Sequence, residues 1–114
     1  MWLEPIARFA ERGTDVEVAK TIITQLGHSA SRMGVMVGAW GFVGSPNSLS
    51  FRFKARAKNG SNAVRIVLDP SDTYTVTFIS NRGSSTKVKG EFSDVYAEDL
   101  TRLFENETGL YLSL

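Results

Sequence analysis

Apolar and cationic residues alternate without interruption over residues 51–58, where the sequence reads Phe-Arg-Phe-Lys-Ala-Arg-Ala-Lys. Successive side chains of a β-strand point to opposite faces of the sheet. A strand at 49–57 therefore turns Phe51 and Phe53 toward a core. Its other face carries a row of cations, formed by Arg52, Lys54, Arg56 and Lys58. The alternation predicts a sheet with one covered face and one open, basic face.

Further strands follow, separated by turn signals. The Asn59-Gly60 pair favours a hairpin, because both residue types tolerate a positive φ. Strands are then predicted at 63–68, 73–80 and 86–91. The residues that these strands turn inward are Val64, Ile66, Leu68, Tyr74, Val76, Phe78 and Val88.

Two short helices are predicted before the strands, at 4–12 and 15–26. Thr14 and Glu17 match a capping box, in which each side chain satisfies a free amide of the other residue. Paired helices also occur in helix-turn-helix DNA-binding domains. The second helix here, however, has an apolar stripe and no cluster of base-reading residues. Packing on the sheet is therefore the favoured role of both helices.

A last helix is predicted at 94–107, with Ser93 as its cap and Gly109 after its end. An apolar stripe at helical spacing should face the core. It consists of Tyr96, Leu100, Leu103 and Phe104. The apolar residues at 110–114 are expected to pack down against the domain.

Residues 33–43 form an apolar segment that contains three glycines. Because apolar residues occupy both parities, a strand here would be covered on both faces or lie at an interface. Trp40 and Phe42 are the candidate contacts with a partner, since tryptophan is enriched at binding hot spots. Packing of the same side chains in the core is the favoured interpretation of this segment. The glycine spacing does not match the dinucleotide-binding pattern.

These elements predict one α+β domain over residues 1–114. It comprises two N-terminal helices, an antiparallel meander of four to five strands, and a C-terminal helix packed on one sheet face. Short connections favour pairing between sequential strands. Helices on one face would leave the other face of the sheet in water.

Charge is distributed unevenly along the chain. Residues 1–51 are neutral, residues 52–89 hold eight cations and two anions (+6), and residues 90–114 hold one cation and six anions (−5). A basic stretch of this kind is typical of a surface that binds polyanions. Neutralisation of the basic sheet by the acidic C-terminal part is the alternative.

Several classes of function are disfavoured. The chain has no cysteine, which excludes disulfides, thiolate metal sites and a cysteine nucleophile. His28 is the only histidine, and no spacing around it indicates catalysis, so we expect a non-enzymatic protein without cofactor or metal. No apolar run reaches the roughly 20 residues that span a bilayer. The first residues lack the basic region of a secretory signal, which indicates a cytoplasmic location.

Five segments carry a resemblance to a known family. They are Ile23-Thr24-Gln25-Leu26-Gly27, Leu49-Ser50-Phe51-Arg52-Phe53, Val64-Arg65-Ile66, residues 68–76, and residues 96–111. In this order they resemble a family of small uncharacterised proteins of bacteriophages, plasmids and bacterial genomes. The family tends to carry Met-Thr-Gly-Ala and a basic residue where this chain has Met36-Val37-Gly38-Ala39-Trp40. The resemblance implies a mobile element in a bacterial host, and it implies no particular activity.

The predicted function is binding of a nucleic-acid backbone by the basic sheet face. The candidate contacts are Arg52, Lys54, Arg56, Lys58, Arg65, Lys87 and Lys89. Stacking of bases is not expected, because the aromatic residues of the strands alternate to the buried face. The alternatives are an inhibitor that binds a host protein, such as a defence-system nuclease complex, and a small homodimeric structural module.

Overall fold

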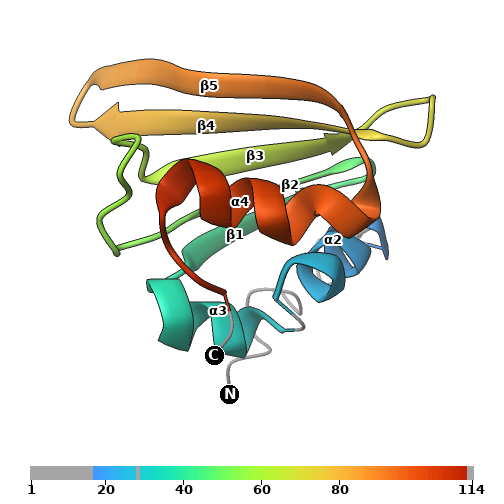
Figure 1. The fold of residues 1–114 in the computed structure, drawn as a ribbon, viewed down its shortest axis with the longest axis horizontal. Coiled ribbons are helices and arrows are strands. Elements are labelled where there is room, and N and C mark those ends of the chain that lie inside the picture. Colours follow the sequence, from blue (N-terminus) through green and yellow to red (C-terminus); the bar gives the residue numbers. More distant parts are fainter. Residues whose placement is uncertain (1–16, 28, 113–114) are drawn as a thin grey trace.

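The computed structural model describes residues 17–27 and 29–112 (Figure 1). Within these residues the fold is α+β, with two helices before a five-stranded antiparallel sheet and one α-helix after it. The strands lie in sequence order, which makes the sheet a meander. The elements are α2 (Glu17–Gly27), α3 (Ala30–Val37), β1 (Trp40–Ser45), β2 (Ser48–Arg52), β3 (Ala63–Leu68), β4 (Tyr74–Arg82), β5 (Ser85–Val95), the 3-10 helix η1 (Ala97–Asp99) and α4 (Leu100–Thr108).

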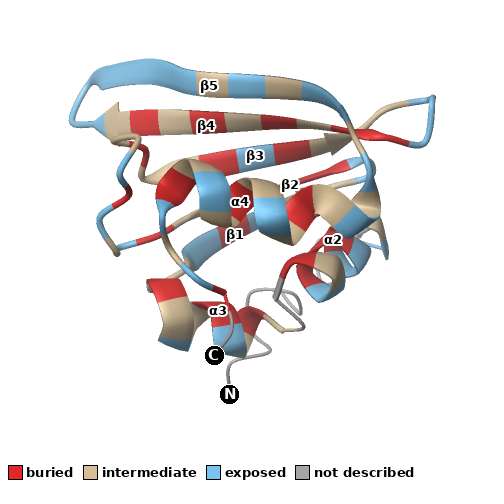
Figure 2. Ribbon diagram, in the orientation of Figure 1, coloured by how far each residue is buried: buried red, intermediate tan, exposed pale blue. Residues whose placement is uncertain are grey.

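The α-helices lie on one side of the sheet (Figure 1). Buried residues alternate with less buried ones along β4, as Figure 2 shows. The predicted strand at 63–68 is confirmed, and the strand predicted at 73–80 is confirmed with bounds Tyr74–Arg82. The helix predicted at 15–26 is confirmed over its described part. The sheet therefore has a helix face that forms the core and an open face.

Phenylalanine rings form the centre of the core. Phe104 of α4 lies 6.3 Å from Phe51, 5.5 Å from Phe53 and 6.2 Å from Phe78 between ring centroids. Phe42 of β1 stacks on Phe51 at 5.2 Å. These rings come from β1, β2, β4, α4 and the segment after β2, so the cluster joins the sheet to its last helix.

The interpretation of 33–43 as one apolar strand was wrong, because Ala30–Val37 is the helix α3. Ser29 caps it by accepting the Arg32 N–H, and Gly38 ends it in the left-handed conformation. The apolar residues that face the core have helical spacing: Ala30, Met33 and Val37. Apolar residues occupy both odd and even positions of 33–43 because this segment contains the end of α3 and the start of β1.

β5 is longer than predicted, and its inward residue was assigned wrongly. Val88 is 63% exposed. The register shifts between the pairs Phe78–Gly90 and Ile79–Val88, which inserts one extra residue in β5. Such a bulge reverses the parity beyond it, so Val88 joins Ile79 on the open face.

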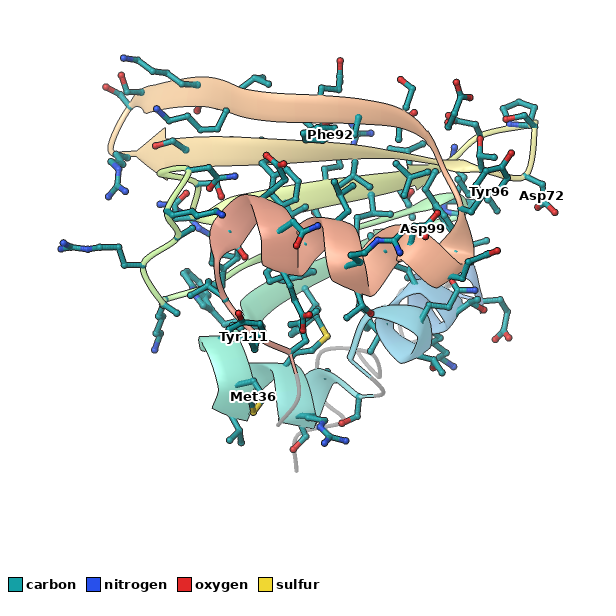
Figure 3. The ribbon with its side chains drawn as sticks, viewed as in Figure 1. Met36, Asp72, Phe92, Tyr96, Asp99 and Tyr111 are labelled. Carbon is teal, nitrogen blue, oxygen red and sulfur yellow. The ribbon has the colours of Figure 1, made fainter. Side chains whose placement is uncertain are left out.

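The C-terminal helix begins later than the apolar stripe predicted. α4 starts at Leu100 after a 3-10 turn, and Ser93 still belongs to β5. Tyr96, the first predicted member of the stripe, is 57% exposed where the chain leaves β5 (Figure 3). Leu100 and Phe104 are buried as predicted, and Gly109 ends the helix with a φ of 74°.

The tail after α4 packs in part as predicted, since Leu112 is buried and Tyr111 is exposed (Figure 3). The predicted helix at 4–12 and the single histidine, His28, lie outside the described residues. Within residues 17–27 and 29–112, no helix is both long and apolar enough to cross a membrane.

Tyr74 gives the fold a dependence on alkaline pH. Burial, and secondarily the nearby Asp72 carboxylate, raise the pKa of its phenol. The folded chain therefore keeps this proton at a pH where the unfolded chain, with an ordinary tyrosine pKa of about 10, releases it. Below about pH 10 the phenol is protonated in both states, so its titration does not change the free energy of unfolding. As the pH rises further, the unfolded chain releases the proton first, and we expect the free energy of unfolding to fall.

Tyr74→Phe should flatten this alkaline loss in urea titrations between about pH 8 and 11. The variant also loses the hydrogen bond to Gln25 Oε1 (3.0 Å), so the slope with pH is the diagnostic quantity and the absolute stability is not. Tyr111→Phe is the matched control, because that side chain is 67% exposed. Equal slopes in Tyr74→Phe and the wild type would contradict the assignment.

Candidate functional site

The chain leaves the sheet at Arg52, before the predicted strand end at 57, and residues 53–62 connect β2 to β3. We call residues 53–62 the basic connection. The alternation continues in it, because Phe53 and Ala57 remain buried. The residues that it exposes are Lys54, Arg56 and Lys58. Periodicity thus predicted which side chains point outward, although the backbone is not a strand.

Two helix ends hold the basic connection in place. The Lys54 and Ala55 N–H groups donate to the Val37 carbonyl, at 3.2 and 3.1 Å, where α3 ends. The Lys58 N–H donates to the Thr108 carbonyl at 2.8 Å, where α4 ends. Carbonyls at a helix end lack partners within the helix. The backbone beyond β2 is thus hydrogen-bonded to the ends of α3 and α4.

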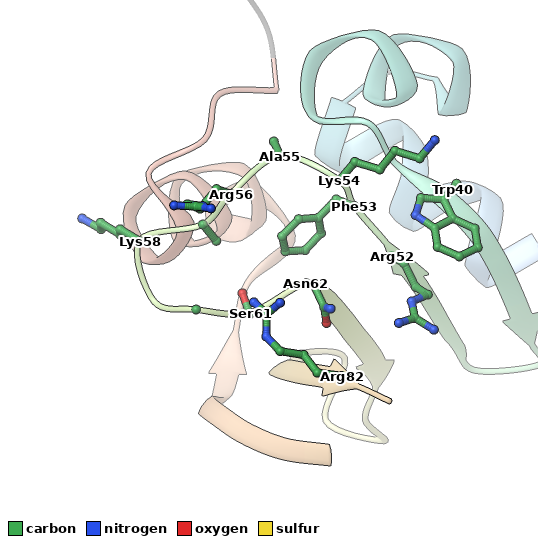
Figure 4. Close-up of a pocket in the computed structure, with 12 residues that line it drawn as sticks. Trp40, Arg52, Phe53, Lys54, Ala55, Arg56, Lys58, Ser61, Asn62 and Arg82 are labelled. Atoms are coloured by element: carbon green, nitrogen blue, oxygen red, sulfur yellow. The ribbon is translucent and has the colours of Figure 1, made fainter. Parts of the chain in front are cut away.

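A groove lies between the basic connection and the adjoining end of the sheet (Figure 4). Its volume is about 600 Å³, within the roughly 300–1,000 Å³ of small-ligand sites. We call it the basic groove. Its lining includes Trp40 and the cations Arg52, Lys54, Arg56, Lys58 and Arg82.

The basic groove concentrates positive charge. Its lining contains no Asp or Glu. Among residues 17–27 and 29–112, ion pairs join Lys20 to Glu17 and Arg102 to Asp99, and none includes a groove cation. The acidic C-terminal part therefore does not neutralise the groove through ion pairs in the described structure. A concave surface lined by one sign of charge attracts ions of the opposite sign.

Arg52 is held in the groove by Trp40 and Asn81. Its guanidinium carbon lies 5.3 Å from the centroid of the Trp40 ring, within cation–π distance. The guanidinium also donates to the Asn81 carbonyl at 3.2 Å. Asn62 donates to the same carbonyl and accepts from the Asn81 N–H, both at 2.8 Å. The end of β4 thus positions both Arg52 and Asn62.

The remaining predicted cations do not share one basic face with Arg52. Arg65 is exposed on the open face, where the register places it between Ser50 and Thr77. Glu91 follows on the far side of Thr77 and accepts its hydroxyl hydrogen bond at 3.1 Å. A carboxylate therefore interrupts the predicted row of cations, and Arg65 stands outside the groove.

Lys87 and Lys89 are exposed near the start of β5. Lys87 pairs with Ser80, and neither lysine lines the groove. Lys89 does approach it, because a Cβ built on Gly60 would lie 3.3 Å from Lys89 Cε. Arg82 is the groove cation that sequence reasoning missed. Its position between the strands predicted at 73–80 and 86–91 was the only signal.

The two predicted partner contacts have different environments. Phe42 is 7% exposed and stacked on Phe51, so it belongs to the core and cannot meet a partner. Trp40 is 47% exposed and lines the basic groove. The aromatic residues expected to face inward, Phe51, Phe53, Tyr74 and Phe78, are all buried. Trp40 is an exposed ring outside that set.

In the part of the chain that the structure describes, no three His, Asp or Glu side chains are grouped as a metal site. The chemistry of the groove is thus that of cations, amides and one indole ring. Comparison with protein-family models, curated proteins and solved structures finds no match to this chain. The functional assignment therefore rests on the geometry of the groove.

Proposed function

We propose that the protein acts by binding, and that the basic groove contacts the phosphate backbone of a nucleic acid. The observation that carries the proposal is the gathering of five cations around one groove without a carboxylate among them. Lysine and arginine are the main donors to nucleic-acid phosphates. The alternating segment at 51–58 supplies four of the five cations: Arg52, Lys54, Arg56 and Lys58.

The rigidity of the groove supports binding. The basic connection is hydrogen-bonded to the ends of α3 and α4, and Asn62 N–H donates to the Ile79 carbonyl at 2.9 Å. Cations on a segment already fixed in this way lose less conformational freedom when they bind. The positive charge is thus presented on a shaped surface and not on a mobile loop.

Nucleic-acid affinity should fall steeply with salt. Neutralisation of four or five phosphates predicts a slope of about −4 for log K against log salt concentration. Fluorescence anisotropy of labelled DNA and RNA, single- and double-stranded, measures this slope. Lys54→Glu/Arg56→Glu/Lys58→Glu should reduce the magnitude of the slope by about 3 and the affinity roughly 100-fold, because each cation contacts one phosphate.

A charge-matched variant provides the control. Arg32→Glu/Arg65→Glu/Lys87→Glu changes the net charge equally, at three exposed residues that do not line the groove. It should retain most of the affinity. Equal losses in the two variants would show that net charge, and not the groove, governs binding. Absence of binding at low salt would reject the proposal.

A host protein is the second candidate partner, favoured by apolar residues on the open face of the sheet. Trp40, Val43 and Val88 are 47%, 59% and 63% exposed. The register places Trp40 and Val88 on the two edge strands, at the ends of one row through Arg52, Ala63 and Ile79. A chain that binds no nucleic acid would instead bind a defence-system component or a second copy of itself through this face.

A further inference from the structure

Trp40 gives the basic groove a property that charge alone does not provide. Its side chain lines the groove among the cations, and 47% of the residue is exposed (Figure 4). Arg52 lies over the ring at 5.3 Å and is itself held by the Asn81 carbonyl. The indole ring is thus partly exposed to solvent, with Arg52 over it and other cations along the same groove.

We infer that the basic groove selects single-stranded nucleic acid, with Trp40 as the stacking platform for an unpaired base. This inference rests on the nucleic-acid binding proposed above. Aromatic platforms and positively charged grooves together characterise proteins that bind single strands. In this arrangement Lys54 and Arg82, which line the same groove as the ring, contact phosphates next to the stacked base.

The inferred stacking contact favours a single strand over a duplex. Bases of a duplex are stacked on one another, so they do not offer a face to an aromatic side chain. A duplex therefore meets the cations of the groove without stacking on Trp40.

The test compares Trp40→Leu and Trp40→Phe with the wild type, using a thymidine 15-mer, a uridine 15-mer and a DNA duplex of equal length. Trp40→Leu should weaken binding of both single strands about 5- to 150-fold, from the stacking contribution of one base. Duplex binding should change less than about twofold. Trp40→Phe keeps an aromatic face and should restore most of the single-strand affinity.

Tryptophan fluorescence provides a second readout. Binding of an unlabelled single strand should quench the emission of the wild type. Trp40→Phe should bind but should lose the quenching that stacking on Trp40 causes. Circular dichroism of each variant verifies that folding is retained.

The outcomes separate this inference from the function on which it rests. If Trp40→Leu binds both the thymidine and the uridine 15-mer more weakly, the result supports stacking with both DNA and RNA. If it binds only one of them more weakly, the result supports stacking with that type of strand alone. Equal losses of single strands and duplex, or no loss at all, overturn the inference. If every oligonucleotide binds and only the triple reversal of Lys54, Arg56 and Lys58 abolishes binding, the proposed function stands without the inference. If none binds, both are overturned.

Discussion

Phe104→Ala should lower the free energy of unfolding by about 3–5 kcal/mol, the usual cost of removing a buried phenylalanine ring. Phe104 is 2% exposed and touches the rings of Phe51, Phe53 and Phe78 with centroid distances of 5.5 to 6.3 Å. Its removal opens a cavity between α4 and the sheet, where no single neighbour can move to fill it. Urea unfolding followed by circular dichroism measures the loss.

Phe92→Ala is the matched control. Phe92 lies on the edge strand β5, is only half-buried, and contacts Phe78 at 6.1 Å. Its truncation leaves a site that water can reach, so the loss should be clearly smaller. A Phe104→Ala loss below that of Phe92→Ala would contradict the aromatic cluster as the centre of stability. Phe53 belongs both to this cluster and to the groove lining, so core packing also supports the candidate site.

Local patterns predicted the elements whose neighbours are also local in sequence. The alternation in β3 and β4 identified Val64, Ile66, Tyr74, Val76 and Phe78 as inward residues, and all five are buried. β3 is joined to β4 by residues 69–73, and β4 to β5 by residues 83–84. Side-chain parity therefore predicted the inward face of these strands, and the short connections predicted their order.

Contacts distant in sequence explain the errors. β2 ends at Arg52, and the Val37 carbonyl at the end of α3 accepts the Lys54 and Ala55 N–H groups. Val88 is exposed because a bulge shifts its pairing with β4. The Val37 carbonyl leaves no periodic signal in the sequence after Arg52. The extra residue of the bulge leaves none in the sequence of β5.

The candidate site was predicted in composition but not in shape. The alternating segment identified Lys54, Arg56 and Lys58 as outward cations, and they are exposed. It placed them on a flat sheet face, whereas they border a groove that Trp40 and Arg82 complete. Those two residues come from the start of β1 and the end of β4. Their proximity depends on the strand order and on the early end of β2, which residue spacing does not encode.

Gly38→Ala should destabilise the fold by about 2–5 kcal/mol, because two costs add. Gly38 has a φ of 70°, where an L-residue costs about 1–2 kcal/mol. A Cβ there would also lie 2.9 Å from Lys54 Cβ and 3.2 Å from Lys54 N, and overpacking of this kind costs about 1–3 kcal/mol. Thermal and urea unfolding measure the sum.

Gly83→Ala separates the two costs. Gly83 also has a positive φ, of 59°, but no atom lies within 4 Å of its virtual Cβ. Gly83→Ala should therefore show only the conformational cost. The additional loss of unfolding free energy in Gly38→Ala measures the close approach of α3 to the basic connection.

The contact that Gly38 permits also places the Lys54 N–H against the end of α3. If the groove is the binding site, folded Gly38→Ala should bind nucleic acid more weakly than folded Gly83→Ala, because its cations are displaced. Equal losses of stability in Gly38→Ala and Gly83→Ala would mean that the basic connection moves away from α3 at no cost. The groove would then have no fixed shape.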